Sequence, residues 1–167
     1  MPELGEIGGN MAGKVKIELQ NTGGLKFEDE FISVTFGFKS EEKLNELKSM
    51  PIVIKNKTAK DVSVRWDYSV FIDPNGDSCR IVPKESPITA GNASLEPTTI
   101  KGNSELKTEV IPNDYIEWST KPVAQLSYKT LLETFVESKV MEFKVFIAVE
   151  VADDVKPYEM TLLGTQI

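Results

Sequence analysis

Apolar and polar residues alternate along much of this chain. A period of two is typical of a β-strand that has one face in the core and the other in water. The alternating segments are 14–19, 31–38, 52–55, 62–72, 106–110, 140–151 and 158–162. The pattern therefore predicts a protein that is mostly β.

The longest alternation in the first half of the chain is 62–72. Its apolar positions, all expected to face the core, are Val62, Val64, Trp66, Tyr68, Val70 and Ile72. The next five residues, Asp73 to Asp77, contain proline and an Asn-Gly pair, which is the composition of a tight turn. We expect Gly76 to take a positive φ there, and residues 78–82 to return as an antiparallel strand.

Other segments predict helices or loops. Ser40 is expected to cap a short helix that ends before Pro51. Tyr128, Leu131, Leu132 and Phe135 recur at helical spacing, which predicts a helix over Ser127–Ser138. The stretch 83–103 is rich in proline and glycine and predicts a long, ordered loop with at most a short bridge near Ser94. The stretch 112–122 is expected to be irregular.

Together these elements predict one antiparallel, immunoglobulin-like β-sandwich of about eight or nine strands with one or two short helices. A closed barrel is the alternative. The chain has 167 residues, the length of one domain, and shows no internal repeat. Residues 1–13 contain four glycines and are interpreted as a flexible arm before a single domain at 14–167.

Composition removes several classes of function. The 19 basic and 26 acidic side chains give a net charge of −7, which argues against nucleic-acid binding. There is no histidine, so the usual catalytic triads and the common zinc and haem ligand sets are absent. No cofactor or metal is expected. No signal peptide or membrane-spanning run is seen in the chain as written, which by default indicates the cytoplasm.

Three segments resemble a family of uncharacterised bacterial envelope proteins, many of them described as putative lipoproteins. These segments are 66–82 (WDYSVFIDPNGDSCRIV), 97–103 (PTTIKGN) and 111–115 (IPNDY). The resemblance covers roughly 51–122 and implies an immunoglobulin-like β-sandwich located in the cell envelope. It implies no activity, cofactor or catalytic residue, and this chain has no lipobox cysteine near its start.

Several acidic residues could carry chemistry. Asp73, Asn75 and Asp77 begin like a calcium loop, but the glycine comes too early and position 12 is Lys84, so a plain hairpin turn is the preferred interpretation. Asp67 with Glu117, or Asp73 with Asp114, could form the carboxylate pair of a glycoside hydrolase.

The single cysteine, Cys79, has no histidine to activate it. It is therefore expected to be a buried structural residue on a strand. The sequence also lacks the nucleophile-elbow, P-loop and Rossmann motifs. No catalytic residue is assigned.

The best candidate for a binding surface is the aromatic group Tyr115, Ile116 and Trp118, in a stretch that otherwise has the composition of a loop. Aromatic side chains give a large contact area at a low cost in entropy. The alternative interpretation is a lid over one end of the core. The sequence thus favours a non-catalytic binding or structural module of a bacterial protein, with a partner protein or polymer. A carboxylate-dependent hydrolase is the second hypothesis.

Overall fold

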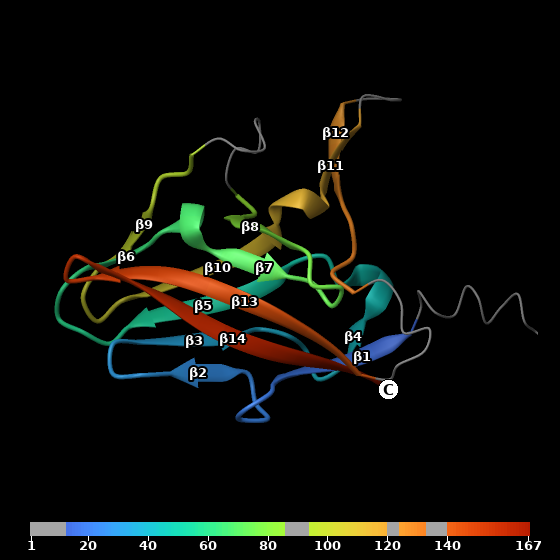
Figure 1. The fold of residues 1–167 in the computed structure, drawn as a ribbon, viewed down its shortest axis with the longest axis horizontal. Coiled ribbons are helices and arrows are strands. Elements are labelled where there is room, and N and C mark those ends of the chain that lie inside the picture. The colour runs from blue at the N-terminus through green and yellow to red at the C-terminus, as the bar shows by residue number, and fades with distance from the viewer. Residues whose placement is uncertain (1–12, 86–93, 120–123, 133–139) are drawn as a thin grey trace, which may run out of the picture.

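The computed structural model describes residues 13–85, 94–119, 124–132 and 140–167 (Figure 1). The predicted arm therefore lies almost wholly outside the described residues. Of the described residues, 58% lie in strands and 7% in 3-10 helices, and none of them lies in a helix of seven residues or more. The prediction of a mostly antiparallel β protein is confirmed.

Most of the strands are short. Their bounds are β1 Lys14–Leu19, β2 Lys26–Glu28, β3 Ile32–Phe36, β4 Glu42–Lys43, β5 Met50–Asn56, β6 Val62–Val64, β7 Val70–Ile72, β8 Ser78–Pro83, β9 Thr98–Ile100, β10 Glu105–Pro112, β11 Ile116–Ser119, β12 Gln125–Tyr128, β13 Val140–Val151 and β14 Asp154–Gln166. Three 3-10 turns lie between them: η1 Leu44–Glu46, η2 Trp66–Tyr68 and η3 Asn113–Tyr115. The described part thus contains more strands than the eight or nine expected.

Twelve strands form one sheet in the order β2-β3-β5-β10-β8-β7-β13-β14-β1-β4, with β6 and β9 attached beside β13. Three of its pairings are hairpins of consecutive strands, β2–β3, β7–β8 and β13–β14, and the others join strands further apart in the chain. The sheet curls where β8 changes partners, since Ile81 and Val82 lie opposite β10 while Cys79 and Arg80 lie opposite β7. A strand that changes partners in this way can turn a sheet back on itself.

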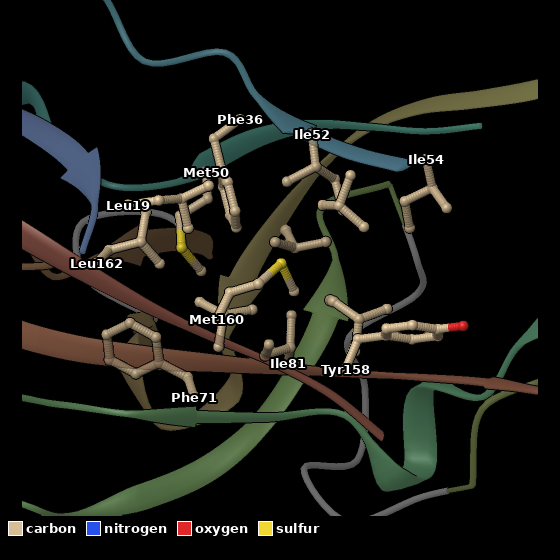
Figure 2. Close-up of a cluster of buried hydrophobic side chains, with 14 of the residues drawn as sticks. Leu19, Phe36, Met50, Ile52, Ile54, Phe71, Ile81, Tyr158, Met160 and Leu162 are labelled. Carbon is tan, nitrogen blue, oxygen red and sulfur yellow. The ribbon is translucent and has the colours of Figure 1, made fainter. Parts of the chain in front are cut away.

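The curled sheet brings two rows of apolar side chains together. Figure 2 shows Phe36, Ile52 and Ile54 on one side of the core, and Tyr158, Met160 and Leu162 of β14 on the other. All six are buried. The period-two pattern predicted that these side chains face inward. Because the sheet curls, the two rows pack against each other and are removed from water.

The expected strand over 62–72 is interrupted by η2. Val62, Val64 and Trp66 face the core as predicted, but Tyr68 is 60% exposed while Ser69 and Phe71 are buried. The prediction for Tyr68, Val70 and Ile72 is therefore wrong. A 3-10 turn has three residues per turn, so it shifts the inward phase by one position. The buried Ser69 hydroxyl donates to the Arg65 carbonyl and accepts the Ala148 N–H, at 3.1 and 3.0 Å.

Both predicted helices are wrong where the structure describes them. The segment after Ser40 forms the short strand β4 and the 3-10 turn η1. In the segment 127–138, Ser127 and Tyr128 belong to β12, and residues 133–139 lie outside the described part. Leu131 and Leu132 are buried, and neither residue lies in a helix. Short apolar runs do not distinguish a buried helix from other buried segments.

The two expected loops also contain regular structure. The stretch 83–103 includes β9, which starts four residues after Ser94 and pairs with β6, while residues 86–93 lie outside the described part. The stretch 112–122 contains η3 and β11. The prediction that it is irregular is therefore wrong where the structure describes it, because β11 pairs with β12, which starts at Gln125.

The turn at 73–77 is confirmed. It joins β7 to β8, and the Gly76 N–H donates to the Asp73 carbonyl at 2.9 Å. Gly76 has a φ of 91°.

We expect Gly76→Val to lower the free energy of unfolding by about 1–3 kcal/mol, because a β-branched residue is strained at positive φ. A denaturant titration measures the change. Gly24→Val is the matched control: a Cβ at either glycine meets nothing within 4 Å, but only Gly76 of the two has a positive φ. Equal losses in the two variants would contradict strain as the cause.

Candidate functional site

The predicted aromatic group lies on a hairpin that stands apart from the large sheet. Strands β11 and β12 form their own two-stranded sheet, and Figure 1 shows this hairpin projecting from the rest of the fold. Ile116 lies opposite Tyr128 and Ser119 lies opposite Gln125. Within the described residues, neither strand pairs with any other strand. The hairpin is therefore held by its base.

The base of the hairpin is anchored to the core through Tyr115. Its ring contacts Phe71 edge to face, with centroids 5.6 Å apart. Its hydroxyl donates to Oδ2 of Asp73 at 3.4 Å. The Lys129 N–H donates to the Tyr115 carbonyl at 2.8 Å, which is the first cross-strand hydrogen bond at the base of the hairpin. Tyr115 is thus a partly buried residue packed against the core at the base of the hairpin.

The cross-strand pairs of the hairpin alternate in polarity. The apolar pairs are Ile116 with Tyr128 and Trp118 with Leu126, and the polar pairs are Glu117 with Ser127 and Ser119 with Gln125. Residues directly opposite share a face, and successive pairs alternate between faces. By register, one face of the hairpin is therefore assigned to the apolar pairs and the other to the polar pairs.

Exposure differs among the apolar positions. Ile116 and Tyr128 are half-buried, and Leu126 is 36% exposed, which makes it one of the most exposed large apolar residues described. The side chain of Trp118 lies outside the described part. Sequence reasoning singled out Tyr115, Ile116 and Trp118 but missed Leu126. Leu126 could have been found from the alternation of apolar and polar residues in both 116–119 and 125–128. The helix predicted over 127–138 obscured this alternation.

Asp67 belongs to a different cluster. Its Oδ1 accepts hydrogen bonds from Nη1 of Arg80 at 2.9 Å and from the Leu95 N–H at 3.0 Å, and its Oδ2 accepts one from the Ser94 hydroxyl at 2.6 Å. The bonds from Ser94, Leu95 and Arg80 hold the pKa of the Asp67 carboxyl below its usual value. The carboxylate borders a small cavity of about 200 Å³. Its function in the fold is to tie the chain before β9 to η2.

We expect this carboxylate to stabilise the protein above the ordinary aspartate pKa of 3.8 and to stop doing so as the pH falls through its lower folded value. Asp67→Asn should cost about 1 kcal/mol at pH 7, since the site is partly exposed and screened by water. The difference from wild type should shrink below pH 4 and vanish at lower pH. Asp154→Asn, at the exposed start of β14, is the control for general acid effects. A difference that does not change with pH would contradict this.

The second proposed acid pair, Asp73 and Asp114, lies close to Cys79. Burial raises the pKa of the Cys79 thiol, and the two carboxylates add to this, while the backbone N–H groups of Asp114 and Asn113 act in the opposite direction. A raised pKa disfavours the thiolate, which is the reactive form of cysteine. Cys79 lies on strand β8 as expected, but it is only half-buried where a buried residue was expected.

Asp73 is also the centre of the turn at 73–77. Its Oδ1 accepts the N–H groups of Asn75 and Asp77, at 2.8 and 3.0 Å. Oδ1 of Asp73 thus accepts two backbone N–H groups, whereas in a calcium loop this oxygen would point at the ion. Among the described residues, no group of three or more acidic or cysteine side chains is arranged to hold a metal ion. Within the same ranges, no helix has the length and hydropathy needed to cross a bilayer.

Comparison of the chain with protein-family models, with curated proteins and with solved structures found no match in any of the three. The resemblance of 51–122 to bacterial envelope proteins therefore stays a prediction from the sequence.

Proposed function

We propose that this protein is a non-catalytic binding module and that the β11–β12 hairpin is its recognition surface. The observation that supports the proposal most directly is an amphipathic hairpin outside the large sheet, with Leu126 partly exposed on its apolar side. A two-stranded hairpin alone is marginally stable in water. An apolar face on such an element is stabilised when a partner covers it.

The acidic clusters offer less support for the hydrolase hypothesis. A general acid in glycoside hydrolysis needs a raised pKa, whereas that of Asp67 is lowered and both of its oxygens accept hydrogen bonds. Glu117, its suggested partner, is an exposed residue of β11. These features favour a structural role for Asp67 and, with it, the binding module.

Two further parts of the proposal come from the sequence. The curled sheet is proposed to be a variant of the immunoglobulin-like sandwich, which is supported by two facing halves around one core. The resemblance to bacterial envelope proteins is the reason to expect a bacterial partner, protein or polymer, in the cell envelope. The hairpin favours a protein over a polymer, because an apolar strand surface suits another polypeptide.

The test places a photo-crosslinking amino acid at position 126 of the full chain in its native host. Val155, which is 45% exposed on β14, is the control position. We expect position 126 to capture one protein that position 155 does not. With that protein purified, Leu126→Ser should weaken binding about tenfold or more, as loss of an interface anchor does, and Val155→Ser should leave it unchanged. Equal capture at both positions would contradict the proposal.

Fluorescence gives a second test within the proposal. If Trp118 contributes to the recognition surface, its emission in a Trp66→Phe background should be red-shifted and quenched by iodide. Trp118→Ala should then change stability by less than about 0.5 kcal/mol. A blue-shifted emission together with a loss of about 3–5 kcal/mol would make Trp118 part of a lid over the core instead.

A further inference from the structure

Several free strand edges in the described part of this fold are protected. The large sheet ends at β2 and at β4. Strand β2 has three residues, two of them charged, and β4 consists of Glu42 and Lys43 alone. Strand β9, which pairs only with β6 among the described strands, also has three residues and lies between Pro97 and Lys101. Short, charged or proline-flanked edges hinder the addition of another strand.

The long strand β14 has an open edge over its first half, where β13 is its only described partner. The Thr161 carbonyl accepts the Gln20 N–H, so the backbone groups of Thr161 point toward the β1 side. By the alternation of a strand, those of Pro157 point the same way. Proline has no N–H to offer there, and Nζ of the adjacent Lys156 lies 5.0 Å above the Phe31 ring. This edge is also protected.

Strand β12 is also short, Lys129 follows it, and Nζ of Lys84 lies 5.8 Å from the Tyr128 ring centre, but the strand itself is uncharged. Residues 122–128 (PVAQLSY) contain no charged side chain, in a chain of which 27% is charged. In the described part of the structure, β11 is the only strand that pairs with β12. The side chains of Gln125, Leu126 and Ser127 are exposed.

The hydrogen-bond pattern defines which backbone groups this edge presents. The Lys129 N–H donates to the Tyr115 carbonyl, so that opposed pair is a hydrogen-bonded one. Hydrogen-bonded and non-hydrogen-bonded pairs alternate in an antiparallel ladder. Ser127 and Gln125 therefore turn their backbone groups toward β11, while Leu126 and Tyr128 turn theirs to the outer edge.

We propose that β12 binds an extended, uncharged segment of a partner protein as a third strand of the hairpin. The N–H and C=O groups of Leu126 and Tyr128 hydrogen-bond to this segment, and its apolar residues, at every second position, extend the apolar face beside Leu126. The inference deepens the proposed function, on which it rests, by naming the mode of recognition and the chemistry of the partner.

Area and charge favour a partner over a second copy of the chain. If β12 paired with β12 of a second copy, only four residues of each chain would form the contact. Such a contact buries far less than the roughly 1,600 Å² of a specific stable interface. Two chains of net charge −7 also repel each other. A segment of another protein can continue beyond these four residues onto the body of the fold.

The test uses a library of random peptides displayed on phage, selected on the full chain. Two variants of one residue distinguish the contribution of the side chain from that of the backbone N–H. Leu126→Ala removes most of the side chain and keeps the outward N–H, whereas Leu126→Pro also removes the N–H. We expect selected peptides to be uncharged with apolar residues at alternate positions. They should bind Leu126→Pro about tenfold more weakly than Leu126→Ala, which corresponds to about 1.4 kcal/mol.

Hydrogen exchange on the wild-type chain gives a measurement that does not depend on how the proline variant folds. Adding a selected peptide should slow exchange at the amides of Leu126 and Tyr128. Unchanged exchange at these amides, selection of charged peptides, or selection of no peptide would each overturn the proposal. A wild-type dimer that becomes monomeric in Leu126→Pro would overturn it too, by making a second copy the occupant.

These outcomes differ from failure of the proposed function. If position 126 captures a partner but that partner binds the proline and alanine variants equally, strand addition is wrong and the binding module stands. If position 126 captures nothing beyond the control position, the recognition surface itself is wrong.

Discussion

Trp66→Ala should lower the free energy of unfolding by about 3–5 kcal/mol, whereas Tyr68→Ala, two residues further on, should cost less than about 1 kcal/mol. Trp66 is 1% exposed, and its indole N–H donates to the Thr98 hydroxyl at 2.8 Å. Truncation therefore leaves a cavity and an unpaired hydroxyl. Chemical denaturation of both variants provides the measurement.

Tyr68 is the matched control because the alternation places both residues on the same side of a continuous strand. In the structure, η2 turns Tyr68 outward, where the Arg65 guanidinium lies 5.7 Å from its ring centre. Tyr68→Ala removes this contact from a side chain that is mostly exposed. Similar large losses in the two variants would mean that 62–72 is an uninterrupted strand after all.

Asn56→Ala should cost about 3 kcal/mol, which is large for a polar residue. Asn56 is fully buried, and its Nδ2 donates to the carbonyls of Lys60 and Ile100 at 2.6 and 3.0 Å. Its Oδ1 accepts from the N–H and the hydroxyl of Thr58, at 2.9 and 2.7 Å. Replacing the side chain by a methyl group removes these four hydrogen bonds. Water replaces them poorly, because the site is closed to most of the solvent.

Thermal or denaturant unfolding of Asn56→Ala and Asn56→Asp provides the measurement. The aspartate keeps the shape but places a charge against two carbonyls, so it should be at least as destabilising at pH 7. Asn75→Ala is the control, since Asn75 is exposed and uses its backbone N–H in the turn. A loss below about 1 kcal/mol for Asn56→Ala would show that the site admits water.

The strands were predictable where local periodicity and burial agree. In β1, β3 and β13, apolar residues at every second position face the core, because a strand alternates its side chains whatever its neighbours are. The turn at 73–77 was predictable for a similar reason, since glycine tolerates the positive φ found at Gly76. Of the candidate site, the sequence identified Tyr115 and Ile116 as unusual in their surroundings.

Three features depended on contacts between residues distant in the chain. The shift of phase at Ser69 requires the Ala148 N–H to bond its hydroxyl from β13. The curl of the sheet requires β8 to pair with β10 and β7. The lowered pKa of Asp67 requires Ser94 and Leu95, more than 25 residues later in the chain.

The hairpin shows the same division within one element. The sequence by itself determined that positions 116, 118, 126 and 128 are apolar and that 122–128 carries no charge. It did not determine that these two segments pair. In a run of only four residues, the spacing of apolar positions does not distinguish a strand from a helix. Only the tertiary structure decided this, since Tyr115 anchored against Phe71 and bonded to Lys129 sets the register that brings Leu126 opposite position 118.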